Sequence, residues 1–230
     1  MELSRRWLEN FACCKTPRLL VAVVLPLALA ACGGSGTGSS GVSPEPPAAA
    51  TTPKVALAAA TPKDLVLAGS DVGDGWTVVP SETRAITVAE AVDGDSAALL
   101  KIERPAYRSG YEVLYTNPQK KRVAASQVYR YANPTVARRI YRLGLRDVAR
   151  RNPGYKPMKA PPGAPHGVSM FRGTVKTKTA GTVPLYVAFW LRGKDIGCVF
   201  VIGKSTSPLL LALLASKQDQ RMAAAATAGV

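Results

Sequence analysis

The chain has 230 residues and carries 30 lysine and arginine side chains against 15 aspartate and glutamate side chains, a formal net charge of +15 at pH 7. A chain of this length can bury a sizeable hydrophobic core. It contains no Gly-x-Ser-x-Gly elbow, no complete P-loop and no His-Glu-x-x-His helix, which excludes the enzyme classes that depend on these motifs.

The chain begins with a basic leader, which is followed by an apolar run over residues 19–31. A helix that spans a bilayer needs about 20 apolar residues, and this run is shorter. The run ends in Leu29-Ala30-Ala31-Cys32 and is followed by Gly33-Gly34, a pattern typical of a cleaved export signal. We therefore expect residues 1–31 to be a signal peptide.

Leu29-Ala30-Ala31-Cys32 resembles the lipobox of bacterial lipoproteins. The resemblance implies that Cys32 receives a diacylglyceryl group and becomes the first residue of the mature protein. The protein would then be held by lipid on the extracytoplasmic face of a bacterial cell membrane, since two or three acyl chains anchor stably. Ser4-Arg5-Arg6-Trp7-Leu8 also resembles a twin-arginine export motif. Glu9 stands where that motif usually has an apolar residue, so the general secretory route is favoured and the twin-arginine route is the alternative.

Residues 32–60 are rich in Gly, Ser, Thr, Pro and Ala, with Glu45 and Lys54 as their only charges. Such a composition buries nothing and predicts a flexible linker, with a reach of tens of ångströms. The remaining residues, 61–230, are expected to form a single domain.

Cysteine usage indicates an exported protein without disulfides. Cys13 and Cys14 lie in the leader and Cys32 carries the lipid, so only Cys198 remains, within an apolar run that predicts a buried strand. We expect Cys198 to be a small core residue, with a reactive thiol as the alternative. One cysteine and the single histidine, His166, cannot assemble a zinc site, and no metal or cofactor is expected.

The predicted elements alternate between strands and helices. They are a helix beginning at Thr61-Pro62, a strand at residues 76–79, a hairpin of residues 111–115 and 123–131, a helix from Asn133-Pro134 to about Arg151, a loop at residues 157–167, strands at residues 170–176, 183–192 and 196–202, and a helix from Leu209 to about Ala225. This pattern predicts an α+β fold: an antiparallel sheet of about five to six strands with two to three helices packed on one face, a two-layer sandwich. The element order over residues 62–225 is similar to that of small PsbP-like envelope lipoprotein domains, a resemblance that implies the fold class and no functional residue.

Positive charge is concentrated in the middle of the chain. Residues 101–160 hold fifteen basic and three acidic side chains, a net charge of +12. On the helix predicted there, arginines at four-residue spacing share one face. The candidate binding residues are Arg138, Arg139, Arg142, Arg146, Arg150 and Arg151. Guanidinium groups at this density suit phosphate or carboxylate partners, and the alternative is a solvated helix face.

These patterns leave three candidate functions, and the third is an unrecognised enzyme. The first is an envelope lipoprotein whose basic domain binds an anionic lipid headgroup, wall polymer or acidic protein; nucleic acid is not expected as a partner. No catalytic residue can be nominated. The second is a carrier or sensor that holds an apolar ligand between sheet and helices. Its pocket would be lined by Tyr186, Phe189, Trp190 and Phe200.

Overall fold

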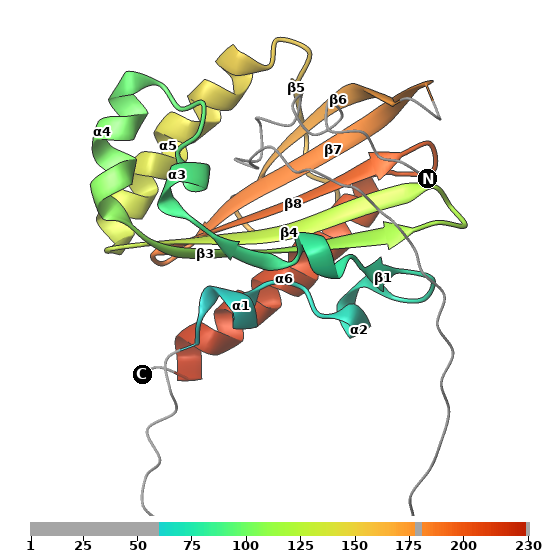
Figure 1. Cartoon of the computed structure of the whole chain (residues 1–230), viewed down its shortest axis with the longest axis horizontal. Helices are drawn as coiled ribbons and strands as arrows, with labels where there is room; N and C mark the ends of the chain where they lie inside the picture. Colours follow the sequence, from blue (N-terminus) through green and yellow to red (C-terminus); the bar gives the residue numbers. More distant parts are fainter. Residues whose placement is uncertain (1–59, 178–180, 229–230) are drawn as a thin grey trace, which may run out of the picture.

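The computed structural model describes residues 60–177 and 181–228, which contain one antiparallel eight-stranded sheet with helices on both faces (Figure 1). The strands are β1 (Thr77–Val78), β2 (Arg84–Ile86), β3 (Tyr107–Asn117), β4 (Arg122–Tyr131), β5 (Lys156–Met158), β6 (Ser169–Thr177), β7 (Gly181–Arg192) and β8 (Asp195–Gly203). The helices are α1 (Pro62–Leu65), α2 (Gly69–Val72), the 3-10 helix η2 (Pro80–Glu82), α3 (Val88–Ala91), α4 (Ala97–Ala106), α5 (Pro134–Arg151) and α6 (Pro208–Ala228).

The strands lie in the order β1-β3-β4-β8-β7-β6-β5, and β2 also pairs with β3. Two hairpins form the centre of this sheet. In β3–β4 the chain turns at residues 118–121, and in β7–β8 it turns at Gly193, whose φ of +59° favours glycine. The two hairpins join where β4 pairs with β8, so the last strand of the chain lies at the centre of the sheet.

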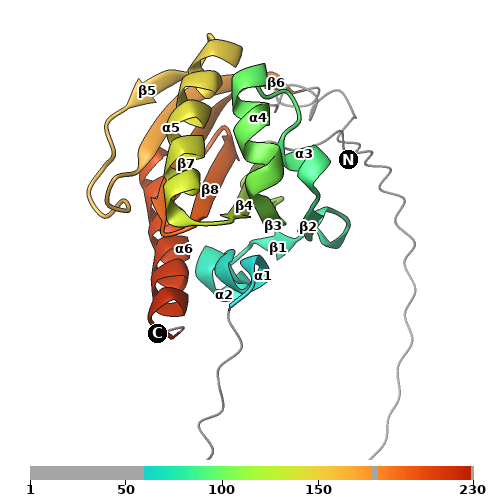
Figure 2. The ribbon, with the colours of Figure 1, turned by 90° about the vertical axis from the view of Figure 1, so that its left-hand side faces the viewer.

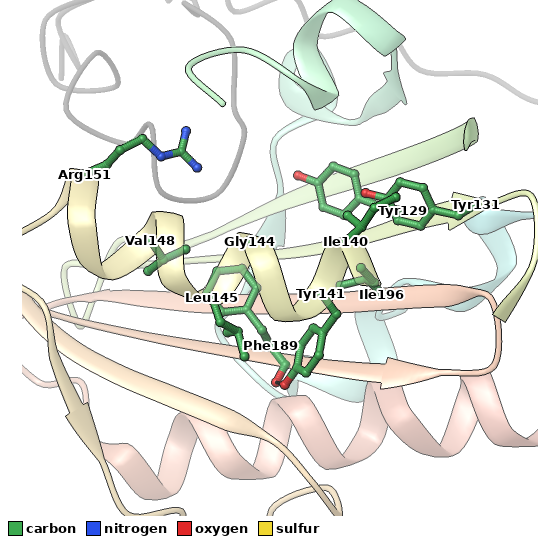
Figure 3. A pocket seen from close by; sticks show the side chains of 10 residues that line it. All are labelled: Tyr129, Tyr131, Ile140, Tyr141, Gly144, Leu145, Val148, Arg151, Phe189 and Ile196. Atoms are coloured by element: carbon green, nitrogen blue, oxygen red, sulfur yellow. Dashed lines mark hydrogen bonds between the residues drawn. The ribbon is translucent and has the colours of Figure 1, made fainter. Parts of the chain in front are cut away.

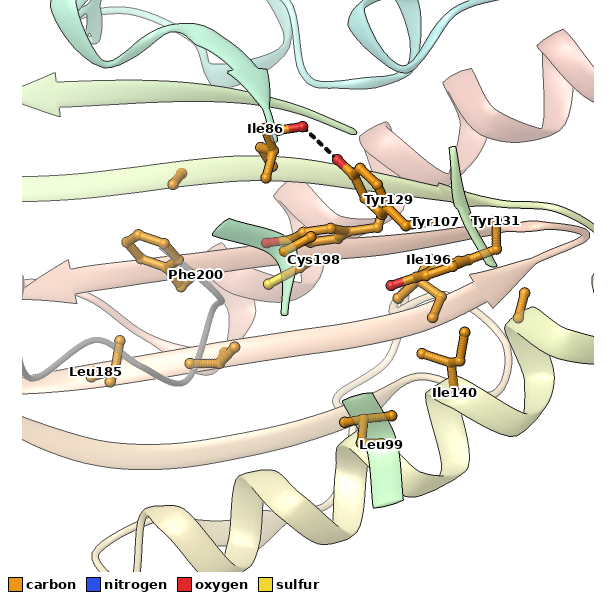
Figure 4. Close-up of a cluster of buried hydrophobic side chains, with 14 of the residues drawn as sticks. Ile86, Leu99, Tyr107, Tyr129, Tyr131, Ile140, Leu185, Ile196, Cys198 and Phe200 are labelled. Carbon is orange, nitrogen blue, oxygen red and sulfur yellow. Dashed lines mark hydrogen bonds between the residues drawn. The ribbon is translucent and has the colours of Figure 1, made fainter. Parts of the chain in front are cut away.

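Both faces of the central strands are apolar. Ala125 and Tyr129 of β4 belong to the hydrophobic cluster on the α4–α5 face, whereas Ala124 and Val128 belong to the cluster on the α6 face. This alternation follows from the two-residue period of a strand. Figure 4 shows the first cluster, in which Leu99 of α4 and Ile140 of α5 contribute side chains to the core.

The α+β class and the antiparallel sheet are confirmed, and the sheet is larger than the five to six strands expected. Helices also cover both of its faces, whereas the sequence pattern predicted a two-layer arrangement with helices on one face (Figure 2). The physical reason lies in β7 and β8, where neighbouring residues such as Trp190 and Phe189, or Val199 and Phe200, point to opposite faces and are all apolar. Each face therefore needs its own cover.

Helix α5 begins and ends where its sequence predicts. The Asn133 side chain accepts a 2.9 Å hydrogen bond from the Val136 amide, Pro134 occupies the first turn, and the helix stops at Asn152. Helix α4, in contrast, was not predicted. Ser96 caps it by accepting a hydrogen bond from the Leu99 amide at 3.4 Å.

Cys198 is fully buried in β8, which confirms its expected place in the core. No helix within residues 60–177 and 181–228 combines the length and the apolar character needed to cross a bilayer. The expected signal peptide, Cys32 and residues 33–59 of the expected linker lie outside the described residues.

Candidate anion-binding groove

Helices α4 and α5 lie side by side and antiparallel on one face of the sheet (Figure 2). At one end of the pair, the backbone amide of Ser96 donates a 2.9 Å hydrogen bond to the carboxylate of Asp147. At the other end, the amide of Ala132 donates a 2.9 Å hydrogen bond to the carbonyl of Ala106. The two contacts fix the helices relative to each other at both ends.

An open groove of about 780 Å³ runs between the two helices. Its lining residues are Ala97, Ala98, Lys101 and Ile102 from α4, and Thr135, Arg138, Arg139, Arg142, Leu143 and Arg146 from α5. The alanines leave room on the α4 side, and the half-buried Ile102 and Leu143 provide apolar surface. The groove is therefore a concave surface with charged walls and an apolar component.

Five cationic side chains line this groove, and no carboxylate does. All five are exposed, and none of them makes a hydrogen bond or ion pair with another residue in the described part of the chain. Six arginines elsewhere in the described part of the chain are engaged in ion pairs, namely Arg84, Arg130, Arg150, Arg151, Arg192 and Arg221. The groove thus gathers cations that the fold does not neutralise.

The structure divides the six arginines predicted as a binding surface. Arg138, Arg139, Arg142 and Arg146 line the groove. Arg151 has a different position: its side chain is only 13% exposed, and it donates to the Gly94 carbonyl at 2.7 Å and to the fully buried carboxylate of Asp95 at 3.3 Å. It fastens the loop before α4 to the end of α5.

Arg150 is exposed and donates a 3.4 Å hydrogen bond to Asp147. Burial alone would raise the pKa of Asp147, but hydrogen bonds from Ser96 and the charges of Arg151 and Arg150 bring that pKa below its ordinary value. Asp147 is therefore an ionised group that holds α4, α5 and Arg150 together, and it is not among the residues that line the groove.

Lys101 is the one cationic residue of the groove lining that was not predicted from the sequence. It comes from α4, a helix that was not predicted either, and it reaches the site because α4 packs against α5. The signal available in the sequence was the positive balance of residues 101–160, which includes Lys101.

A second hollow lies between α5 and the sheet (Figure 3). It is lined by Tyr129, Tyr131, Ile140, Tyr141, Gly144, Leu145, Val148, Arg151, Phe189 and Ile196, and its volume is about 50 Å³. An apolar cavity that holds benzene measures about 150 Å³. This hollow therefore has room for a few water molecules only.

The tyrosine hydroxyls around that hollow already have partners inside the protein. Tyr131 donates to Glu103 at 2.5 Å, Tyr129 donates to Gln127 at 3.1 Å, and Tyr141 donates to the Phe189 carbonyl at 3.0 Å. They tie the hollow's walls to the surrounding core.

Of the four aromatic residues expected to line a ligand pocket, only Phe189 borders this hollow. Phe200 packs in the core cluster on the same face of the sheet, whereas Trp190 and Tyr186 lie on the α6 face. The four side chains therefore do not share a pocket.

The remaining titratable candidates do not assemble a metal site in the part of the chain that the structure describes. No group of three or more His, Cys, Asp and Glu side chains that could hold a metal ion occurs there. His166 is exposed in the loop after β5. Burial raises the pKa of Glu112 to about 7, but this buried carboxyl accepts a hydrogen bond from Gln127 and is not among the residues that line the groove.

Among known proteins, the match to this chain comes from solved structures. No family model and no curated protein sequence matches the chain. Among solved structures, the chain is similar to the extracellular domain of PknH from Mycobacterium tuberculosis, with 10% sequence identity and a TM-score of 0.48. The similarity covers 68% of this chain and 93% of that one.

Proposed function

We propose that this protein is a bacterial envelope lipoprotein, anchored through a diacylglyceryl group on Cys32, whose domain of residues 61–230 binds an anionic partner in the α4–α5 groove. The observation that carries the proposal is a set of five cations around one concave surface, with no ion-pair partner and no lining carboxylate among the described residues: Lys101, Arg138, Arg139, Arg142 and Arg146. The anchor rests on the lipobox resemblance of Leu29-Ala30-Ala31-Cys32.

The electrostatics of the groove favour a bound anion. Arg138, Arg142 and Arg146 follow one another at four-residue spacing on α5, and like charges at this spacing destabilise a helix by about 0.2–0.5 kcal/mol per pair. An anion between them removes this repulsion and replaces it with charge-assisted hydrogen bonds. Binding should therefore also stabilise the folded protein.

The apolar-ligand alternative finds less support. The hollow between α5 and the sheet holds about 50 Å³, and the aromatic residues expected around a ligand are divided between the two faces of the sheet. The groove is the larger concavity, and its lining charge specifies what kind of ligand it would accept.

The test compares two variants with the same net charge. The groove variant combines Arg138→Gln, Arg142→Gln and Arg146→Gln. The control variant combines Lys120→Gln, Arg172→Gln and Lys204→Gln, three exposed positions outside the groove. The salt concentration that releases the full chain from a phosphocellulose column, in a non-ionic detergent, is the measurement.

We expect the groove variant to elute at clearly lower salt than both the wild type and the control variant, because it alone loses the charges that line the groove. Equal elution of the two variants would overturn the proposal, since net charge alone would then explain retention. Circular dichroism before and after the column verifies that both variants are folded.

A further inference from the structure

The cations of the groove are arranged in a line. Arg138, Arg142 and Arg146 recur every four residues, so they advance by about 6 Å per step and span about 12 Å along α5. Arg139 lies on the same wall, and Lys101 comes from the opposite wall on α4. A ligand with one charge meets one or two of these groups, whereas an extended ligand with repeated charges can meet all of them.

The concave shape selects a thin ligand. The groove is open along its length, with Ala97 and Ala98 on the α4 side and apolar surface from Ile102 and Leu143. A flat bilayer surface contacts only the rims of such a groove, whereas a single polymer chain can lie inside it and place its carbon atoms against the apolar residues.

The hydrogen-bonding character of the lining selects against a peptide. Lysine and arginine side chains donate hydrogen bonds and accept none. Among the side chains that line the groove, only the Thr135 hydroxyl can accept one. A phosphate chain offers acceptors at every repeat, whereas an acidic peptide also brings a backbone N–H per residue for which the groove supplies almost no partner.

The groove also lies on the far side of the sheet from the point where the expected linker enters. The carbonyl of Ala60 accepts a 2.5 Å hydrogen bond from Arg130, and Ala60 packs against the cluster on the α6 face. The groove helices cover the other face (Figure 1). A domain tethered through Ala60 therefore presents the groove away from the tether.

We infer that the ligand of the α4–α5 groove is a linear phosphate-bearing polymer that lies lengthwise between the two helices. This inference rests on the proposed function and names its ligand class. Each repeat adds a contact within one complex, so affinity grows with chain length until the groove is filled.

The test uses the full chain in a non-ionic detergent with defined probes: inorganic phosphate, tripolyphosphate and long-chain inorganic polyphosphate. Poly-L-glutamate represents acidic protein, and micelles doped with phosphatidylglycerol represent lipid. Affinity is measured by isothermal titration calorimetry at several salt concentrations, with the groove variant and the control variant defined above.

We expect long-chain polyphosphate to bind at least tenfold more tightly than tripolyphosphate at equal phosphate concentration, and inorganic phosphate to bind weakest. The logarithm of the association constant should fall with the logarithm of salt concentration with a slope of about −3, as for four to five neutralised charges on a flexible chain. The groove variant should lose at least tenfold in affinity, and the slope should fall to about −1. The control variant should retain the wild-type values.

Different results overturn the inference and the proposed function. If phosphatidylglycerol micelles or poly-L-glutamate bind as tightly as polyphosphate and lose binding in the groove variant, or if chain length has no effect, the phosphate-polymer inference is wrong and the anion-binding groove remains. If the groove variant binds every probe as the control variant does, both are wrong.

Discussion

The amide of Ser96 donates a hydrogen bond to the carboxylate of Asp147 across 51 residues of sequence, and this contact joins the start of α4 to the last turns of α5. The bond matters for the proposed function because the groove exists only while the two helices stay side by side. It satisfies a backbone donor at the first turn of α4 and places a negative charge at that helix N-terminus, where the helix dipole favours it.

Replacement of Asp147 by alanine should therefore loosen the helix pair. The change leaves the Ser96 amide without its partner, and we expect the free energy of unfolding to fall by about 1–3 kcal/mol. Urea denaturation measures the loss, with the exposed Asp93→Ala as the control. An unchanged midpoint would mean that the contact does not hold α4 in place.

Arg151 should behave as a structural residue and not as a ligand contact. Arg151→Gln removes the charge beside the buried Asp95 carboxylate, and we expect a loss of about 2–3 kcal/mol in the free energy of unfolding, less than for a fully buried pair because Arg151 still reaches solvent. Arg150→Gln, at an exposed position, should change it by less than about 0.5 kcal/mol.

A comparison of Arg151→Gln with Arg142→Gln separates stability from binding. Arg151→Gln should retain wild-type affinity for polyphosphate under conditions in which it is folded, whereas Arg142→Gln should lose affinity and keep its stability. A large loss of affinity in folded Arg151→Gln would place this residue among the ligand contacts after all.

Two glycine-to-alanine changes should act in opposite directions. A Cβ at Gly197 would lie 2.5 Å from ring atoms of Trp190, its cross-strand partner, whose side chain is 1% exposed. Overpacking of this kind costs about 1–3 kcal/mol. A Cβ at Gly144 in α5 meets nothing within 4 Å, so Gly144→Ala should stabilise the protein by about 0.5–1 kcal/mol through helix propensity. Thermal denaturation of the two variants checks both signs.

Glu112 should make stability depend on pH in the neutral range. Burial raises its pKa from 4.5 to about 7, so between these values the folded protein keeps a proton that the unfolded chain releases. This contribution to stability is therefore complete at low pH and is lost as the pH rises toward and through 7.

Glu112→Gln removes the titrating group and can still accept the hydrogen bond from Gln127. Compared with the wild type, the variant should gain up to about 3 kcal/mol in unfolding free energy between about pH 5 and about pH 8. Urea denaturation across this range is the measurement, and the exposed Asp74→Asn is the control. Parallel pH profiles for wild type and Glu112→Gln would contradict the assignment.

Local patterns in the sequence predicted the elements whose signals lie within a few residues of one another. The Asn133-Pro134 start of α5, the two central hairpins and the long α6 all occur where expected, because caps, turn residues and alternation act locally. The short strands β2 and β5 and the helix α4 were not predicted. Strands of three residues carry too short a pattern, and α4 includes Pro105 near its end.

Helix geometry alone decides which residues share a face, so the four-residue spacing in the sequence was enough to put arginines on one face of α5. The surroundings of these arginines depend on tertiary packing. The packing of α4 against α5 adds Lys101 as an opposite wall and turns a charged helix face into a groove. The pairing of Arg151 with Asp95 removes one predicted member from it. Both outcomes depend on contacts between residues about fifty positions apart, which no local periodicity encodes.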